Sequence, residues 1–174
     1  LNIIKLAFYL SKFQIAYINK STILPFIKLN FPSARMVFSP NFVPVHQVMP
    51  RSTIEDISTT SSSITIGLLG SDSKKNYQDL FSQNFDNEKY NFIVYGHKTP
   101  YTLELVARFP EVSISIFDSD EVSLKELFGQ VDCLVSLAKH EGFGRLNFMA
   151  MTYKIRVFLP VTPVYEEFYS SFSK

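Results

Sequence analysis

The sequence has 174 residues, of which 46% are hydrophobic, so it can form the core of an ordinary folded domain. Its 17 Lys and Arg residues nearly balance its 16 Asp and Glu residues, and the formal net charge of +1 argues against a dedicated nucleic-acid-binding protein. The single cysteine, Cys133, excludes a disulfide within the chain and a Cys/His metal spacing, and it favours a reducing, cytoplasmic setting.

The first 63 residues contain few predicted elements. A helix remnant is expected at 1–12, short strands at 13–18 and 34–40, and between them a short helix with Ser21 as its N-cap. No apolar run approaches the roughly 20 residues of a membrane span. The chain begins with Leu, so we expect its true start to lie upstream. Three prolines and a Ser/Thr cluster then predict an interdomain linker over 40–63.

After the linker, strands and helices alternate regularly. Strands are predicted at 64–70, 91–96, 112–117, 132–137 and 155–160. Helices are predicted at 73–85, 99–109, 123–130, 145–153 and 163–172. Thr99 is the expected N-cap of the second helix, and Gly129 is the expected end of the third. The alternation predicts an α/β fold with a Rossmann-like, doubly wound parallel sheet, which binds ligands at the carboxyl ends of its strands.

One candidate binding loop is the sequence GLLGSDSKKN, residues 67–76, which follows the first strand of this sheet. Gly70 lets the backbone approach a ligand, and the N–H groups at the next helix start favour an anion. Lys74 or Lys75 can add a positive charge. The spacing is neither a P-loop nor G-x-G-x-x-G. The alternative interpretation is an ordinary strand-to-helix turn with solvated lysines.

The second candidate loop is KHEGFGRLNF, residues 139–148. Gly142 and Gly144 allow a sharp turn from strand to helix, and the N–H groups from Gly144 to Leu146 then point outward at the positive end of the helix. Glu141 can accept hydrogen bonds from sugar hydroxyls, and Arg145 can donate to a diphosphate. In the alternative interpretation, Glu141 only caps the helix.

Other polar residues have simpler interpretations. His97 follows Gly96 at a strand end on the same edge, and it is expected to be a solvated loop histidine, with contact to a ligand as the alternative. Cys133 is expected in the core, because no base is placed beside it. Asp118 and Asp120 are expected to form a turn that caps the following helix, and the pair Glu166–Glu167 is expected on a solvated face.

The segment HEGFGRLNFMAM…IRVFLPVTPVYEEF resembles the donor-site signature of retaining GT-B glycosyltransferases of the group 1 class. Members of that family read E-G-F-G-x-x-x-x-E-A-M-A-x-G-x-P-V-V. FSPNFVP, ITIGLLGSDSKKN and LFGQVDCLVSLAKHEGFG are similar to family segments in the same order. The resemblance covers roughly 35–170, with residues 127–168 the more specific part.

The resemblance implies the second half of a GT-B fold. Residues 1–39 would be a remnant of the N-terminal acceptor domain, 40–63 the linker, and 64–174 a nucleotide-sugar-binding domain that is incomplete at its C-terminus. The full enzyme would transfer a hexose from a UDP- or GDP-linked donor to a glycan, lipid or protein acceptor. It would need no metal and no other cofactor, would bind no nucleic acid, and would associate peripherally with membranes through the missing domain.

The resemblance also implies roles for single residues. Glu141 would contact the donor sugar near the reacting carbon, as the catalytic residue. Lys75, with Lys74 as the alternative, would neutralise the diphosphate leaving group beside Gly70. The remaining donor-binding residues would be Gly142, Phe143, Gly144, Arg145 and Leu146.

The sequence departs from the family pattern at several positions. The second glutamate of the signature falls on Met149, which cannot accept ribose hydroxyl hydrogen bonds, and the usual glycine falls on Lys154. GT-B catalysis occurs in a cleft between two domains, so we expect little activity from this chain alone. Two other hypotheses stay open: a degenerate, non-catalytic module that supports a partner chain, and a generic Rossmann-like binding domain. The missing G-x-G-x-x-G counts against the second.

Overall fold

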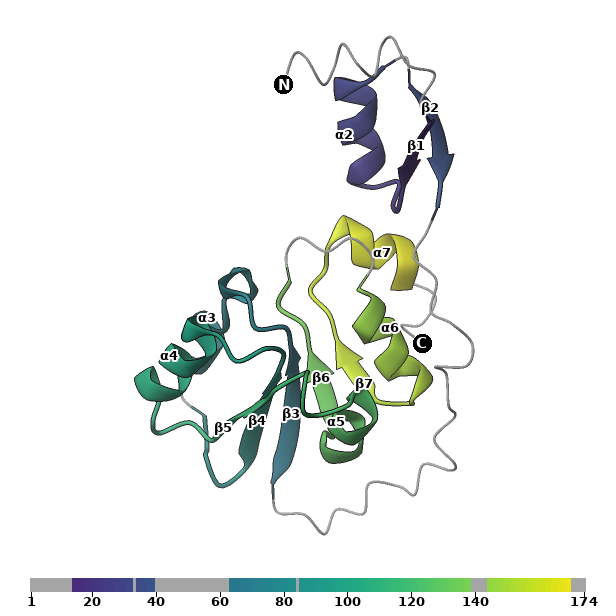
Figure 1. Cartoon of the computed structure of the whole chain (residues 1–174). Helices are drawn as coiled ribbons and strands as arrows, with labels where there is room; N and C mark the ends of the chain where they lie inside the picture. The colour runs from purple at the N-terminus through teal and green to yellow at the C-terminus, as the bar shows by residue number, and fades with distance from the viewer. Residues whose placement is uncertain (1–13, 33, 40–62, 84, 139–143, 170–174) are drawn as a thin grey trace. The chain divides into compact units, whose positions relative to one another are not determined.

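The computed structural model describes residues 14–32, 34–39, 63–83, 85–138 and 144–169 (Figure 1). These residues form two compact units. The two-stranded unit contains the described residues up to 39 together with 144–145 and 161–169. The five-stranded unit contains the described residues of 63–138 and 146–160. The helix expected at 1–12 and nearly all of the expected linker lie outside the described residues.

The five-stranded unit is built on a parallel sheet. Its strands are β3 (Ile64–Leu69), β4 (Tyr90–Tyr95), β5 (Ile114–Phe117), β6 (Cys133–Val135) and β7 (Arg156–Phe158). Their order is β5-β4-β3-β6-β7, and every neighbouring pair is parallel. This confirms the predicted Rossmann-like α/β fold. The chain winds outward from β3 through β4 to β5 and then crosses to β6, so the topological switch point lies between β3 and β6.

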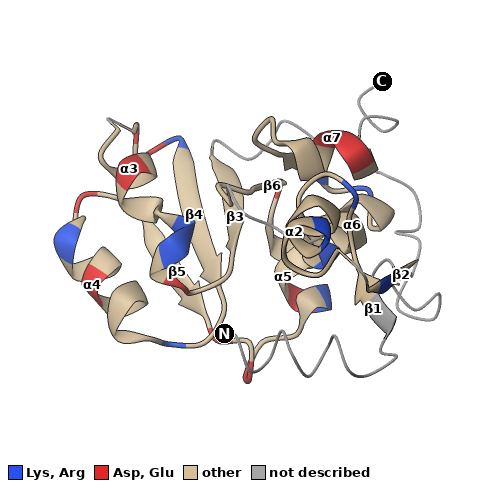
Figure 2. Ribbon diagram, turned by 90° about the horizontal axis from the view of Figure 1, so that it is seen from above, with Lys and Arg blue, Asp and Glu red and all other residues tan. Residues whose placement is uncertain are grey.

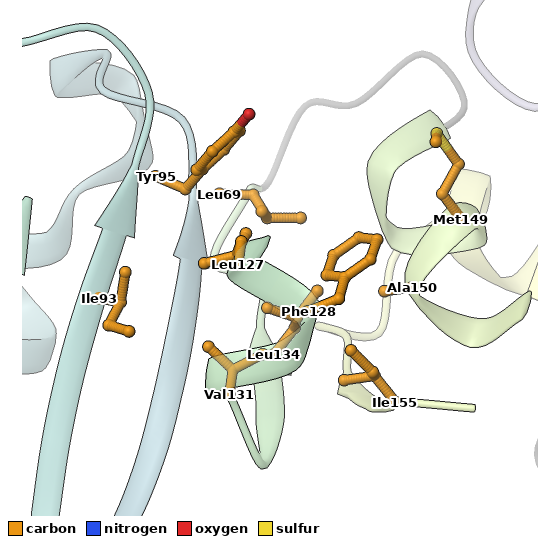
Figure 3. Packing of buried hydrophobic residues seen from close by; sticks show 10 residues of the cluster. All are labelled: Leu69, Ile93, Tyr95, Leu127, Phe128, Val131, Leu134, Met149, Ala150 and Ile155. Atoms are coloured by element: carbon orange, nitrogen blue, oxygen red, sulfur yellow. The ribbon is translucent and has the colours of Figure 1, made fainter. Parts of the chain in front are cut away.

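Both faces of this sheet are covered, because successive residues of a strand point to opposite faces. Leu68, Phe92 and Val94 belong to one hydrophobic cluster, which includes Tyr77 and Phe81 of α3 (Tyr77–Phe81) and Leu105 of α4 (Pro100–Arg108). The next residues along the strands form a second cluster with α5 (Leu124–Gln130) and α6 (Arg145–Thr152) (Figure 3). Its members are Leu69, Ile93, Tyr95, Leu127, Phe128, Val131, Leu134, Met149, Ala150 and Ile155.

Three local predictions for this unit had different outcomes. The helix expected at 73–85 is broken into a 3₁₀ turn, η2 (Ser73–Lys75), and α3, because Asn76 adopts a left-handed φ of 53°. The prediction that Gly129 ends its helix was wrong, since α5 continues through it to Gln130. Thr99 does cap α4, through a reciprocal pair of bonds with Thr102.

The two-stranded unit contains β1 (Gln14–Tyr17) and β2 (Arg35–Phe38), which are parallel, with α2 (Ile23–Asn30) between them in the chain and α7 (Pro163–Tyr169). The expected N-cap Ser21 was wrong. Asn19, which is fully buried, instead accepts hydrogen bonds of 2.9 Å from the N–H groups of Thr22 and Ile23 through its Oδ1.

The C-terminal helix α7 bonds to the start of this unit. The Glu167 carboxylate accepts hydrogen bonds from the backbone N–H groups of Lys20, at 2.9 Å, and Ser21, at 2.8 Å. The expected solvated face is therefore correct for the exposed Glu166 and wrong for Glu167. No helix in the described part of the chain combines the length and apolar character that crossing a bilayer requires.

Candidate functional site

The switch point places two strand ends side by side. Leu68 of β3 pairs with Val135 of β6, and the strands are parallel, so the residues that follow them leave the same edge of the sheet. Gly70 follows β3, and residues 136–138 follow β6 and lead toward the second candidate loop. Ligands of open parallel sheets bind in the crevice at such a point, so this edge is the candidate site.

The structure brings two of the predicted site residues together in the turn after β3. Gly70 has a left-handed φ of 100°, and a Cβ built on it would lie 2.8 Å from Cε and 3.6 Å from Nζ of Lys75. The Lys75 side chain therefore lies over the glycine. Lys74 behaves differently, because its side chain is 88% exposed and its Nζ lies 4.0 Å from Asp72. Of the two lysines left open by the sequence, Lys75 is the one held at the strand end.

This turn is fixed by side chains from both neighbouring helices. The Tyr77 hydroxyl donates to the carbonyls of Leu69, at 2.9 Å, and Gly70, at 3.0 Å. Burial, with a smaller effect of Tyr101, raises the pKa of Tyr77 far above its ordinary value, so the hydroxyl keeps its proton. Thr99 Oγ1 donates to the Ser71 carbonyl at 3.1 Å. Lys75 therefore projects from a rigid support.

Only part of the second candidate loop is described. Glu141, Gly142 and Phe143 lie outside the described residues. Gly144 is buried with a left-handed φ of 74°, and its carbonyl accepts a 2.9 Å hydrogen bond from the Tyr169 hydroxyl. The positive φ gives a physical reason for glycine at this position.

The two residues after Gly144 begin α6. Arg145 is exposed at the first position of the helix. Leu146 is half-buried and packs against the cluster that contains Met149 and Leu69. The Leu146 side chain is therefore part of the core, and only its backbone is left to serve a ligand.

Comparisons with known proteins identify the fold. No protein-family model matches the sequence, and a sequence comparison with curated proteins finds no relative. Among solved structures, TarM matches with a TM-score of 0.57 and 14% identity over 84% of this chain and 29% of that chain. The pneumococcal O-GlcNAc transferase GtfA, in complex with UDP and GlcNAc, matches with a TM-score of 0.52 and 14% identity over 84% and 29%. AviGT4, a glycosyltransferase involved in avilamycin A biosynthesis, matches with a TM-score of 0.50 and 9% identity over 83% and 43%.

The chain has the Rossmann-like α/β fold of GT-B glycosyltransferases. It spans less than half the length of each of the three matched proteins. At these identities, the likeness is one of fold.

The structure describes two residues at which the sequence departs from the signature that it resembles. Met149, where the resemblance expects a second glutamate, is buried in the cluster with Phe128 and Ala150 (Figure 3). Lys154, at the position of the glycine, has a left-handed φ of 60°. The N–H of Lys154 donates to Met151, and that of Ile155 donates to Ala150, which is the hydrogen-bond pattern of a glycine-terminated helix end.

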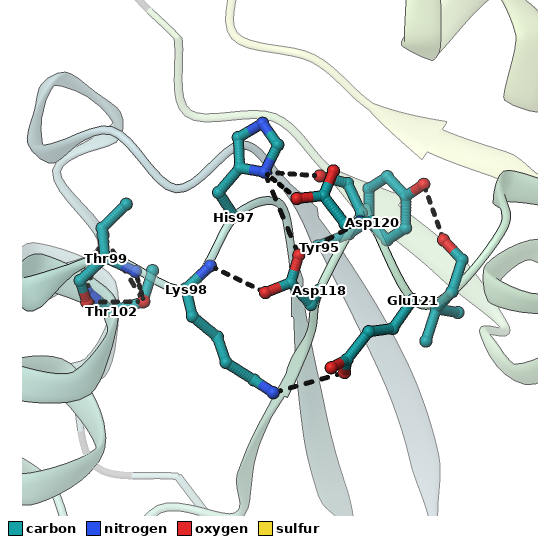
Figure 4. Close-up of polar contacts among 10 residues, drawn as sticks. Tyr95, His97, Lys98, Thr99, Thr102, Asp118, Asp120 and Glu121 are labelled. Carbon is teal, nitrogen blue, oxygen red and sulfur yellow. Dashed lines mark hydrogen bonds and ion pairs between the residues drawn. The ribbon is translucent and has the colours of Figure 1, made fainter.

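The sequence did not reveal a polar group at the carboxyl ends of β4 and β5, which lie on the side of β3 away from β6. Asp118 and Asp120, which follow β5, lie beside His97, which follows β4 (Figure 4). His97 is exposed as expected, but its Nδ1 lies only 3.3 Å from Asp120 Oδ2. The signal that could have found it is that all three residues lie within three positions of the ends of strands that are neighbours in the sheet.

Two further predictions for single residues can be compared with the structure. Asp118 and Asp120 do form a turn but do not cap α5, which is capped by Ser123 paired with Glu126. Cys133 is a core residue, as expected, and burial raises the pKa of its thiol. Acidic and basic residues both occur on α4 and α5, without separation by sign (Figure 2).

Proposed function

We propose that this chain is the donor-binding part of a glycosyltransferase, which holds a nucleotide-diphosphate sugar for transfer of a hexose with retention. The observation that carries the proposal is the position of Lys75, held over Gly70 at the carboxyl end of the central strand, next to the switch point. The GtfA structure, which contains UDP and GlcNAc and has a similar fold, supports a nucleotide-linked donor.

Each proposed residue has a chemical task in this function. The Lys75 ammonium balances charge on the diphosphate leaving group, with Lys74 contributing at longer range. Gly70 lets Lys75 lie close to the strand end. Glu141 accepts hydrogen bonds from the donor sugar next to the reacting carbon, on a loop shaped by Gly142, Phe143 and Gly144. Arg145 and the Leu146 backbone serve the sugar or its diphosphate. These cationic groups take the place of a metal ion.

The proposal extends to a longer protein in which this chain would be the donor-binding part. The donor is UDP- or GDP-linked, and the acceptor is a glycan, lipid or protein that binds on a second domain. The protein acts in the cytoplasm, and membrane association, where it occurs, is peripheral and through that second domain.

A non-catalytic module that supports a partner chain is the second candidate. The burial of Met149 favours it, because the side chain at that position belongs to the core and offers no carboxylate to a ribose. Both candidates share the fold, so nucleotide binding distinguishes them.

Calorimetric titration with UDP, GDP and UDP-glucose tests the proposal. We expect one of the three to bind, and expect Lys75→Ala and Glu141→Ala to weaken it by roughly tenfold, the equivalent of about 1.4 kcal/mol. Lys74→Ala is the matched control, with a smaller expected effect because that lysine is solvated. A folded protein that binds none of the three would overturn the donor-binding proposal and favour the non-catalytic module.

A further inference from the structure

Three side chains that can ligate a metal converge at the carboxyl ends of β4 and β5 (Figure 4). Nδ1 of His97 lies 3.3 Å from Oδ2 of Asp120 and 3.9 Å from Oδ1 of Asp118. The three residues can present one ligand atom each, all within 4.8 Å of one another. Two ligands that each lie about 2.1 Å from a tetrahedral cation are about 3.4 Å apart, so the observed separations suit a shared ion.

The backbone of the two loops holds these side chains in place. The Gly96 N–H donates to the Phe117 carbonyl at 3.1 Å, and the Ser119 N–H donates back to the Gly96 carbonyl at 3.3 Å. His97 and Asp118 therefore project from loops that are bonded to each other. A site on such a support needs little reorganisation to bind an ion.

The Asp118 carboxylate is itself oriented by backbone donors. Its Oδ1 accepts from the Asp120 N–H at 3.1 Å, and its Oδ2 accepts from the Lys98 N–H at 3.2 Å. These two bonds hold the Asp118 carboxylate in one orientation, as second-shell bonds hold a metal ligand.

Carboxylates predominate in this group of three side chains. Asp118 and Asp120 bring two carboxylates to the group. The ammonium of Lys98 lies 3.3 Å from Glu121 and forms an ion pair with that residue. Ser119 Oγ, 3.3 Å from His97 Nδ1, adds a neutral polar atom beside the group.

We propose that His97, Asp118 and Asp120 bind a divalent transition-metal cation of the Zn²⁺ type, with water at the remaining positions. One imidazole nitrogen with two carboxylate oxygens suits such a cation, whereas Mg²⁺ and Ca²⁺ prefer oxygen ligands alone. The bound ion cross-links the loops after β4 and β5 and stabilises that edge of the five-stranded unit.

This site is separate from the proposed donor site and does not depend on it. Its residues follow β4 and β5, whereas the proposed donor residues follow β3 and β6. The ion has a structural role here, so the expectation that sugar transfer needs no metal is unaffected. Cysteine and histidine spacing could not reveal it, because two of its three ligands are carboxylates.

Calorimetric titration of the metal-free chain with ZnCl₂ tests this proposal, and Co²⁺ absorption reports the coordination. We expect one saturable site that excess MgCl₂ does not displace. His97→Gln and Asp120→Asn should each weaken Zn²⁺ binding by at least roughly tenfold. Glu121→Gln, an adjacent carboxylate outside the group, and His46→Gln, a histidine elsewhere in the sequence, are the matched controls and should bind as the parent protein does.

Thermal unfolding shows whether a variant that fails to bind Zn²⁺ is still folded. The substituted side chains of His97 and Asp120 are 67% and 77% exposed, so the metal-free variants should unfold near the parent temperature. Zn²⁺ should raise the unfolding temperature of the parent and not that of His97→Gln. Absence of saturable Zn²⁺ binding, or equal binding by the parent and both ligand variants, would overturn the site and leave only a polar contact between His97 and the aspartates.

Discussion

The hydroxyl of Tyr169 donates a 2.9 Å hydrogen bond to the carbonyl of Gly144, which lies 25 residues earlier in the chain. The bond is buried and joins the last described residue of α7 to the residue that precedes α6. Gly144 has a left-handed φ of 74°, so it marks a sharp change of chain direction. Tyr169 therefore fixes the end of the glycine loop assigned above to the donor.

The first prediction concerns this bond. Tyr169→Phe removes the hydroxyl that donates this hydrogen bond and leaves the buried Gly144 carbonyl without its partner. The free energy of unfolding, measured by urea titration, should therefore fall by about 1 kcal/mol. If the loop that ends at Gly144 binds the nucleotide sugar, the affinity for nucleotide should fall as well. Tyr90→Phe, a half-buried tyrosine of β4, is the control. Lower stability with unchanged nucleotide affinity would show that Tyr169 has only a structural role.

The second prediction concerns Glu167, which accepts hydrogen bonds from Lys20 and Ser21. At pH 7, Glu167→Gln should lower the free energy of unfolding by about 1 kcal/mol, a value reduced for partial exposure. Glu166→Gln is the matched control, because the neighbouring carboxylate is exposed. Equal effects of the two substitutions would contradict the assignment of the bond.

The contribution of Glu167 to the free energy of unfolding should also depend on pH. Burial raises the pKa of Glu167, but hydrogen bonds from Lys20 and Ser21 and the charge of Lys20 together lower it more, so the pKa lies below the ordinary 4.5. The unfolded chain then takes up a proton at higher pH than the folded chain does. The contribution of Glu167 is complete above pH 4.5 and is lost as the pH falls through the folded-state pKa. Urea titrations between pH 6 and pH 3 should show the parent and Glu167→Gln converging.

The third prediction compares two glycines. Gly70→Ala should destabilise the protein by about 1–2 kcal/mol, because the residue has φ of 100° and its new Cβ would meet Cε of Lys75. It should also weaken nucleotide binding by displacing that lysine. Gly129→Ala should stabilise α5 by about 0.5–1 kcal/mol, since a Cβ there meets nothing within 4 Å. Thermal unfolding measures the stability of both variants. A change of the same sign in the two variants would contradict the backbone geometry described for these glycines.

The fourth prediction concerns the left-handed residue after α6. Lys154→Gly should raise the free energy of unfolding by about 1 kcal/mol, because glycine adopts a φ of 60° without the strain that a Cβ causes. Lys154→Ala removes the same charged side chain but keeps the Cβ, and it should give no such gain. Chemical denaturation of the three proteins checks this. A gain in both variants would mean that removal of the charge, and not the backbone, is responsible.

The strands and helices of the five-stranded unit could be predicted because each is marked by residues within its own segment. Ile64–Leu69 and Tyr90–Tyr95 are apolar runs typical of strands buried on both faces, and Thr99 with Pro100 indicates a helix start. The break at Asn76 was not predictable from apolar spacing, because the residues that indicate the helical face, such as Tyr77 and Phe81, all follow Asn76 and say nothing about Ser73–Lys75.

Partners far apart in the sequence explain the other misses. Glu167 is predicted to be solvated on its own helix, and only the fold places it against Ser21, 146 residues away. His97 and Asp118 come together only when β4 and β5 are known to be neighbours. Gly70 and Lys75 were predicted as a pair because they share one turn, and the structure supplies the reason to prefer Lys75 over Lys74.

Backbone amide NMR during titration with UDP, GDP or UDP-glucose tests the central claim most directly. If a nucleotide-linked donor binds at the switch point, the largest shifts should fall on Gly70, Lys75, Leu146 and their neighbours. Amides at the amino ends of the strands, such as Thr65 and Asn91, should change little. Saturable shifts confined to the amino-end edge, or none with any of the three ligands in a folded sample, would contradict a donor site on the Gly70–Lys75 turn.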